Sequence, residues 1–270
     1  SANLPPVDDL YSRASQFETT RILDRNGKIL YEIIDPNAGR RTYVPLSKIS
    51  PYLVAATIAT EDKNFYTHPG FDPLAIARAF YQNWQNEGET VSGASTITQQ
   101  LARLLLFSIE ERYEQTYRRK IREALAAAEI TRRYTKDEIL ELYLNEINYG
   151  NISYGIQAAS ESYFNTTADQ LTLGQAAFLA GLPQSPSIYD IVNNRDATLK
   201  RMQDVLTLMY KTSLDNGCIY VSNSPERVCV DQAVVLAGYS EIQNYPFQPP
   251  SIQMRYPHWV NYVRLLLESK

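Results

Sequence analysis

The sequence predicts a mainly α-helical fold that opens with a short β-hairpin. Residues 50–212 carry helix start signals followed by apolar residues at helical spacing. Residues 19–34 instead place β-forming side chains on both sides of Asn26-Gly27, a strong hairpin turn signal. We therefore expect a β-containing segment, a helical domain and an irregular segment, at residues 1–49, 50–212 and 213–270.

Composition limits the class of protein before any motif is considered. The 270 residues are 44% hydrophobic and 21% charged, with 11 Gly and 14 Pro, which excludes collagen-like and disordered chains. The net charge of −4 argues against a nucleic-acid binder, because such proteins usually carry a basic excess. Two histidines are too few for a zinc site built on several histidines.

Four capping patterns predict helix starts. Two place a capping side chain before a proline at the first helical position. The other two match the capping box, in which a hydroxyl residue is followed three positions later by Glu or Gln. These patterns are Ser50-Pro51, Asp72-Pro73, Thr135 to Glu138 and Thr172 to Gln175.

Glu61 continues the apolar face of the first predicted helix. Val54, Thr57, Ile58 and Glu61 share that face at spacings of three and four residues. Burial there raises the pKa of a carboxyl group, which makes it a usable proton acceptor near neutral pH. The alternative is a carboxylate at the helix end that faces water.

A run of small hydroxyl residues leads into a later helix. Residues 92–103 read SGASTITQQLAR, and hydroxyl groups followed by two amides and a cation at a helix start can hold an anion. The alternative is an ordinary Ser/Thr N-cap. The sequence contains no GxSxG or SxxK motif, which disfavours a serine nucleophile.

A basic cluster lies within a long predicted helix. Residues 116–136 include seven basic and two acidic side chains, a local charge of +5. Glu123 follows Arg119 by four residues and Lys120 by three, so the three side chains share a face. One interpretation is a solvated face with ion pairs. The other is a pyrophosphate clamp beside a carboxylate that assists departure or holds a divalent cation.

Cys218 and Cys229 are the two cysteines of the sequence and lie 11 residues apart in a turn-rich stretch. One disulfide in an oxidising compartment fits this count, and two unrelated thiols fit it equally well.

Taken together, these strings resemble the peptidoglycan glycosyltransferase domain of class A penicillin-binding proteins, which polymerises lipid II. They occur in the order typical of that family, over about residues 19–210. The resemblance implies a lysozyme-like, two-lobed fold. The matching strings are EDKNFYTHPG (61–70), GASTITQQLA (93–102), RKIRE (119–123), KDEILELYLNEINYG (136–150), YGIQAASESYF (154–164) and LAGLPQSPSIYD (179–190), and PHWVNYVR (257–264) resembles a flanking segment.

The resemblance implies that Glu61 is the general base, which deprotonates the 4-hydroxyl of incoming lipid II for attack on the growing chain. Glu123 would assist departure of undecaprenyl pyrophosphate, directly or through Mg²⁺ or Mn²⁺. The implied reaction inverts the α-linked donor to a β-1,4 product. The implied substrate-binding residues are Arg119 and Lys120 at the pyrophosphate, Ser95, Thr96, Gln99, Gln100 and Arg103 along the donor groove, and Asp62, Phe65 and His68 around Glu61, with Lys136 and Asn145 architectural.

Three features depart from the family pattern. Gly93-Ala94 replaces the usual Gly-Gly, and Arg103-Leu104 replaces the usual Lys-Asn. Arg103 keeps the positive charge and shares a helical face with Gln99 and Gln100, so we expect it to point at the donor pyrophosphate. The greater spacing between Gln100 and Arg119 predicts a lengthened loop at 109–116.

The implied partners are lipid II, the growing lipid-linked glycan chain, the membrane surface and a transpeptidase domain in the full-length chain, where residues 213–270 would lead. Residues 73–84 predict an amphipathic helix tipped with aromatic residues, either interfacial or packed in the core. The sequence has no apolar run of the roughly 18–20 residues that cross a bilayer. The implied location, the extracytoplasmic face of the bacterial membrane, therefore requires an N-terminal anchor before this sequence.

Two other functions are compatible with parts of the pattern. A lytic transglycosylase or muramidase is also lysozyme-like, but it cleaves glycan and has no pyrophosphate to hold, which the Arg119-Lys120 pair argues against. A non-catalytic scaffold that binds lipid II is supported only by the Arg103-Leu104 departure, and the presence of both Glu61 and Glu123 argues against it.

Overall fold

A computed structural model of the protein describes residues 7–14, 19–33, 39–73, 95–114, 116–248 and 263. These residues are mainly helical, as the sequence predicts. The helices are α1 (Leu10–Ala14), α2 (Pro51–Glu61), α4 (Ile97–Leu106), α5 (Ile109–Tyr113), α6 (Tyr117–Arg133), α7 (Lys136–Glu146), α8 (Ile156–Phe164), α9 (Leu173–Gly181), α10 (Arg195–Asn216) and α11 (Gln232–Gln243). The strands are β1 (Thr20–Leu23), β2 (Ile29–Ile33), β3 (Arg40–Arg41) and β4 (Ser153–Tyr154), and the 3₁₀ helices are η1 (Leu46–Lys48), η2 (Ala168–Gln170) and η3 (Leu182–Gln184).

The predicted helix starts are confirmed wherever the structure describes them. The Ser50 side chain accepts a hydrogen bond from the amide of Tyr52 at the start of α2. Capping boxes begin α7 and α9, at Thr135 and Thr172. The predicted helix at 73–84 lies outside the described residues beyond Pro73, as does the segment 257–264 except for Val263.

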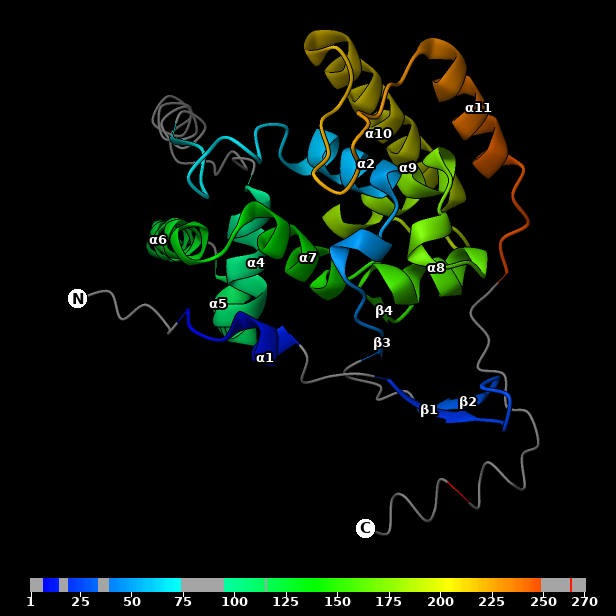
Figure 1. Ribbon diagram of the computed structural model, residues 1–270, viewed down its shortest axis with the longest axis horizontal. Helices are drawn as coiled ribbons and strands as arrows, with labels where there is room; N and C mark the ends of the chain where they lie inside the picture. The colour runs from blue at the N-terminus through cyan, green and yellow to red at the C-terminus, as the bar shows by residue number, and fades with distance from the viewer. Residues whose placement is uncertain are drawn as a thin grey trace.

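The predicted hairpin is also confirmed. Strands β1 and β2 pair antiparallel, and the Asp24 side chain accepts from the amides of Asn26 and Lys28 in the turn, at 2.8 and 2.9 Å. Gly27 has a φ of +80°, a conformation that suits glycine. The hairpin lies to one side of the helices (Figure 1), and Arg21 links it to Glu161 of α8 through a 2.9 Å ion pair.

The helices form two groups with α7 between them (Figure 1). In one group α9 packs against α2, α10 and α11, and in the other α4 packs against α6 and α7. This arrangement agrees with the mainly α, two-lobed fold expected from the sequence. The short parallel pair of β3 and β4 lies beside α8.

Helix α2 packs against both α9 and α10, and its buried residues cover more of its circumference than the single face predicted from their spacing. Leu53 through Ala59 are all buried, and three of them are alanines, whose small side chains allow close helix packing. The helix ends at Glu61. Because its surroundings are fixed by packing, α2 holds the Glu61 backbone in one place.

The structure differs from the expectation that residues after 212 are irregular. Helix α10 continues to Asn216, and α11 follows. Ile219 and Val228 bridge across a turn and are buried with Val221 and Val230 in the main core. The turn signals of this segment predicted an irregular conformation. Its apolar residues nevertheless alternate along the chain, and they pack into the core.

A second difference concerns the predicted loop at 109–116. Its first half forms the short helix α5, which begins with a capping box between Ser108 and Glu111. The capping pattern at Ser108 and Glu111 therefore determines the conformation of this segment, although the segment is longer than is usual in the family.

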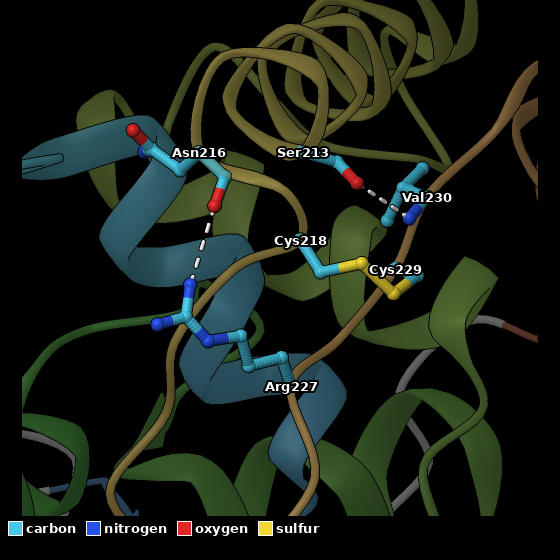
Figure 2. Close-up of a disulfide and its surroundings, with 6 residues drawn as sticks. All are labelled: Ser213, Asn216, Cys218, Arg227, Cys229 and Val230. Atoms are coloured by element: carbon cyan, nitrogen blue, oxygen red, sulfur yellow. Dashed lines mark hydrogen bonds between the residues drawn. A yellow bond between two sulfur atoms is a disulfide. The ribbon is translucent and has the colours of Figure 1, made fainter.

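The structure joins Cys218 and Cys229 in a disulfide directly after α10 (Figure 2). Two contacts hold this loop to the end of the helix. Arg227 donates to the carbonyl of Asn216 at 3.2 Å, and the amide of Val230 donates to the hydroxyl of Ser213 at 2.9 Å.

The disulfide loop, defined as residues 218–229, also contacts the chain before and after α2. The Asn223 amide donates to the carbonyl of Ile49 before the helix, at 2.7 Å. The Ser222 amide donates to the hydroxyl of Tyr66 after the helix, at 3.0 Å. The loop thus braces the helix that ends at Glu61, although it lies outside the family motifs.

Replacing both cysteines by serine should lower the free energy of unfolding by about 2–3 kcal/mol, because the crosslink restricts the unfolded chain. Urea denaturation of the parent and the double variant measures the difference. A reducing agent should destabilise the parent and leave the variant unchanged. Two free thiols, found by mass spectrometry of the non-reduced protein, would contradict this prediction.

Candidate active site

The carboxyl group of Glu61 lies at the C-terminal end of α2, with 15% of its side chain exposed. Its Oε2 accepts a hydrogen bond of 2.7 Å from the Gln100 amide on α4. Its Oε1 lies 3.9 Å from the guanidinium of Arg201 on α10. Three helices therefore meet at this carboxyl group.

The orientation of the Gln100 amide is fixed from the opposite side. The hydroxyl of Tyr143, a buried residue of α7, donates to Gln100 Oε1 at 3.1 Å. The Gln100 nitrogen must then face Glu61, because the two ends of an amide differ in hydrogen-bonding character. Tyr143 acts on Glu61 through Gln100.

Burial raises the pKa of Glu61, as its position in the sequence predicts. The hydrogen bond from Gln100 and the charges of Arg201 and Arg103 act in the opposite direction, and the neighbouring Asp62 adds to the increase. A carboxyl group with a raised pKa exchanges its proton closer to neutral pH, which is what a general base or acid requires.

Asp62 and His68 form a buried contact that connects α2 to α4. The amide of Gly70 donates to His68 Nδ1 at 3.0 Å, so Nε2 carries the hydrogen and donates to Asp62 at 2.8 Å. Asp62 also accepts from the amide of Ile97 at the start of α4, at 3.0 Å. These two residues place the start of the helix that carries Gln100, and their expected binding of substrate stays a prediction.

Phe65 and Lys136 stabilise the same turn. Phe65 is fully buried, and the Lys136 ammonium lies 4.7 Å from the centre of its ring. Lys136 also donates to the carbonyl of His68, at 2.8 Å. Asn145 is likewise buried, where its side chain bonds the backbone of Val44 and Glu141, which fits the architectural role expected of Lys136 and Asn145.

Thr96 and Gln99 are buried in the structure, and their expected binding of substrate stays a prediction. Both are buried and form the capping box that starts α4. The Thr96 hydroxyl also donates to the carbonyl of Gly70, at 2.6 Å. The ordinary N-cap interpretation therefore holds for these two residues, and Gly93 and Ala94 lie outside the described residues.

Glu123 is fully buried among three cations. Arg119 donates to its Oε2, Arg103 lies 3.7 Å from its Oε1, and Lys120 lies 3.9 Å from its Oε2. Lys120 also donates to the hydroxyl of Ser95. We call Arg103, Arg119, Lys120 and Glu123 the cation cluster. It confirms that Arg119, Lys120 and Glu123 share a face, and it places Arg103 with them.

The cation cluster suits an anion. Its three positive charges exceed the single negative charge, and Arg103 and Lys120 each keep 32% of their side chains exposed. Burial lowers the pKa of Lys120, which is the effect expected of a partly desolvated ammonium group. A bound phosphate oxygen would relieve the repulsion among the cations.

The same residues do not fit the divalent cation that was expected at Glu123. Among the described residues there is no group of three or more His, Cys, Asp or Glu side chains that could hold a metal ion. Glu123 offers one carboxylate, already surrounded by cations, whereas Mg²⁺ prefers several oxygen ligands. We therefore assign no step to a metal ion.

Sequence reasoning missed two residues of this site. Tyr143 lies within the string 136–150, but no pattern distinguishes it from a core residue. Arg201 lies outside all the strings that carry the resemblance. One signal could have identified Arg201, which is its position beside the apolar residues Met202 and Val205 of the same helix. Both of these are buried, and an arginine next to them needs a polar or charged partner.

Known proteins are similar to this chain over most of its length. A family model described as Transglycosylase matches residues 26–210. Penicillin-binding protein 1A/1B of Bacillus subtilis (strain 168) is 40% identical over 236 residues, which cover 87% of this chain and 24% of that protein. Penicillin-binding protein 1A of Escherichia coli (strain K12) is 47% identical over 180 residues, 67% of this chain and 20% of that protein.

The chain therefore belongs to the transglycosylase family, as a transglycosylase domain of class A penicillin-binding proteins. It spans between a fifth and a quarter of the length of these relatives. The crystal structure of Penicillin-Binding Protein 1A from Haemophilus influenzae aligns with 92% of this chain and 23% of its own, at a TM-score of 0.46 and 20% identity.

Replacing Thr96 by alanine should lower the free energy of unfolding by about 1–2 kcal/mol, because α4 loses its N-cap. Chemical denaturation measures this change. Thr96→Ser keeps the hydroxyl and should retain most of the stability. If alanine and serine variants were equally stable, the hydroxyl would not be the cap.

Proposed function

We propose that this chain is a peptidoglycan glycosyltransferase that polymerises lipid II into β-1,4 glycan strands and releases undecaprenyl pyrophosphate. One observation carries the proposal. The partly buried Glu61 and the cation cluster are connected by a chain of polar contacts: Gln100 donates to Glu61 and to the backbone carbonyl of Ser95, and the Ser95 hydroxyl accepts from Lys120, which lies beside Glu123. A base and an anion site are held together in a fixed arrangement.

In the proposed reaction, Glu61 accepts the proton of the 4-hydroxyl of lipid II. The resulting oxygen attacks the anomeric carbon of the growing chain. The bond between that carbon and the pyrophosphate oxygen breaks, and its electron pair leaves with the pyrophosphate. Attack opposite the leaving group converts the α-linked donor to the β-linked product.

The proposed role of the cation cluster is to stabilise the negative charge that develops on the pyrophosphate. Arg103 and Lys120 are partly exposed and can reach a ligand, whereas Arg119 is more buried. Glu123 sits behind them and keeps three like charges close together. Preorganised cations of this kind stabilise a transition state without rearranging during the reaction.

Helix α4 connects the two halves of this site. Gln100 contacts Glu61, and Arg103, three residues later, contacts Glu123. Residues three apart lie on one helical face, so both contacts point to the same side of α4. An enzyme that cleaves glycan would need Glu61 but not the cation cluster, because it has no pyrophosphate to bind. A non-catalytic scaffold that binds lipid II would need neither a buried carboxyl group at position 61 nor its raised pKa.

An exposed apolar stripe on α6 supports the proposal that the domain works at a membrane surface. Its three residues recur every four positions, on the side of the helix opposite the buried Glu123 and Ile130. Exposed arginines lie near it on the same helix, so anionic lipid would match both its charge and its apolar character. The stripe consists of Tyr117, Ile121 and Leu125.

We propose the extracytoplasmic face of the bacterial membrane as the location, with an anchor and a transpeptidase domain in a longer chain. Within the described residues no helix is both long and apolar enough to cross a bilayer. The amphipathic helix expected at 73–84, which lies outside the described residues beyond Pro73, is a second proposed membrane contact.

The direct test is incubation of the protein with labelled lipid II, followed by gel separation of the polymer. Polymer that disappears on addition of moenomycin supports the proposal. Release of short glycan from preformed peptidoglycan, without polymer from lipid II, would favour a glycan-cleaving enzyme instead.

Replacing Glu61 by glutamine should reduce turnover by about 10²-fold or more, because the variant keeps the shape but cannot accept the proton. The labelled lipid II assay measures the rate. The matched control is Glu226→Gln, which changes an exposed carboxylate in the disulfide loop and should leave turnover unchanged. Comparable polymerisation by Glu61→Gln would remove Glu61 from the mechanism.

Replacing Arg103 by alanine should weaken moenomycin binding by about 1.5–3 kcal/mol, the usual range for a charged hydrogen bond. Arg103→Lys should recover much of the loss, because it restores the charge. Binding titrations of the three proteins at one ionic strength make the comparison. An alanine variant that binds as tightly as the parent would leave the clamp to Arg119 and Lys120.

A further inference from the structure

We propose that Arg201 is a positioning residue that holds the Glu61 carboxylate in its reactive orientation from the side opposite Gln100. This inference rests on the proposed role of Glu61 as the base. It concerns a residue 140 positions further along the chain and outside every string that carries the family resemblance.

The geometry assigns the two oxygens of Glu61 different surroundings. Oε2 accepts the 2.7 Å hydrogen bond from Gln100, and Oε1 faces Arg201 Nη2 at 3.9 Å. A separation of 3.9 Å is longer than a hydrogen bond. Arg201 therefore attracts Oε1 electrostatically and leaves its lone pair available to accept a proton.

Arg201 is itself held in place, with only 14% of its side chain exposed. Its Nε donates to the carbonyl of Gly181, at the end of α9, at 3.2 Å. Its guanidinium lies 5.9 Å from the centre of the Tyr189 ring. These contacts fix a long and otherwise flexible side chain before any substrate binds.

Gly181 provides the space for the stem of Arg201. A Cβ atom at position 181 would lie 3.1 Å from Arg201 Cγ, which is closer than ordinary contact. An alanine there would displace the Arg201 stem by a few tenths of an ångström without changing any charge. The position offers an independent way to move Arg201.

The charged and titratable groups that act on Glu61 come from every element around it. Arg201 on α10 and Arg103 on α4 favour its ionised form, and Asp62 disfavours it. Tyr143 of α7 and Tyr149 beyond it also face this charge. Arg201 has the strongest effect of these charges, so its removal should raise the pKa of Glu61 further.

The closing experiment compares four proteins in the lipid II assay across a range of pH. Arg201→Met should lower kcat by about ten- to a hundredfold, the scale of a misplaced reacting group. The acidic limb of its rate profile should move to higher pH, because Glu61 must ionise to act. Arg201→Lys should recover part of kcat and part of the shift.

Lys200→Met is the matched control. It removes one positive charge from the neighbouring position on α10, where the side chain is exposed and pairs with Asp204. It should leave kcat and the rate profile unchanged. A parent-like profile for Arg201→Met, or an equal shift for Lys200→Met, would overturn the proposal.

Two further measurements separate this inference from the proposed function and from simple misfolding. Gly181→Ala should fold and should shift the profile in the same direction as Arg201→Met, by less. Carbon-13 NMR of glutamate-labelled protein, with Glu61→Gln to identify the signal, measures the titration of Glu61 without substrate. If the parent makes no polymer, the proposed function fails, and an unchanged Glu61 titration in Arg201→Met would separately reject the role of Arg201.

Discussion

The site depends on one constraint, which is that the Glu61 carboxyl group emerges from a helix buried along most of its length. Desolvation disfavours its charge, and two neighbouring helices compensate: Gln100 of α4 donates a hydrogen bond, and Arg201 of α10 supplies a positive charge. The helix cannot shift to relieve the cost, because α9 and α10 cover it and the disulfide loop contacts the backbone before it and Tyr66 after it. The raised pKa of Glu61 follows from this rigid burial.

The start of α4 links the fixed position of α2 to the position of the cation cluster. Asp62, directly after Glu61, accepts from the amide of Ile97, and Thr96 and Gln99 cap the same helix end. Once the start of α4 is fixed, Gln100 and Arg103 follow with defined orientations. Several residues of the family strings therefore position the helix that carries Gln100 and Arg103, which explains why they are buried.

The cation cluster resolves an electrostatic conflict within a chain of net negative charge. Three cations crowd together on α4 and α6 and would repel one another without the buried Glu123 between them. One carboxylate cannot neutralise three cations, so the site keeps a positive excess. That excess is directed outward through Arg103 and Lys120. Glu123 thus holds the three cations together while remaining out of contact with solvent.

The sequence by itself determined the features that depend on near neighbours along the chain: the hairpin turn at Asn26-Gly27, the helix caps and the shared face of Arg119, Lys120 and Glu123. These are local because capping and helical periodicity act over three or four residues. Only the tertiary structure decided that Thr96 and Gln99 are buried, that residues 217–248 join the main core and that Arg201 faces Glu61. Periodicity indicates which side of a helix is covered, but the residue that covers it comes from elsewhere in the chain and is selected by packing.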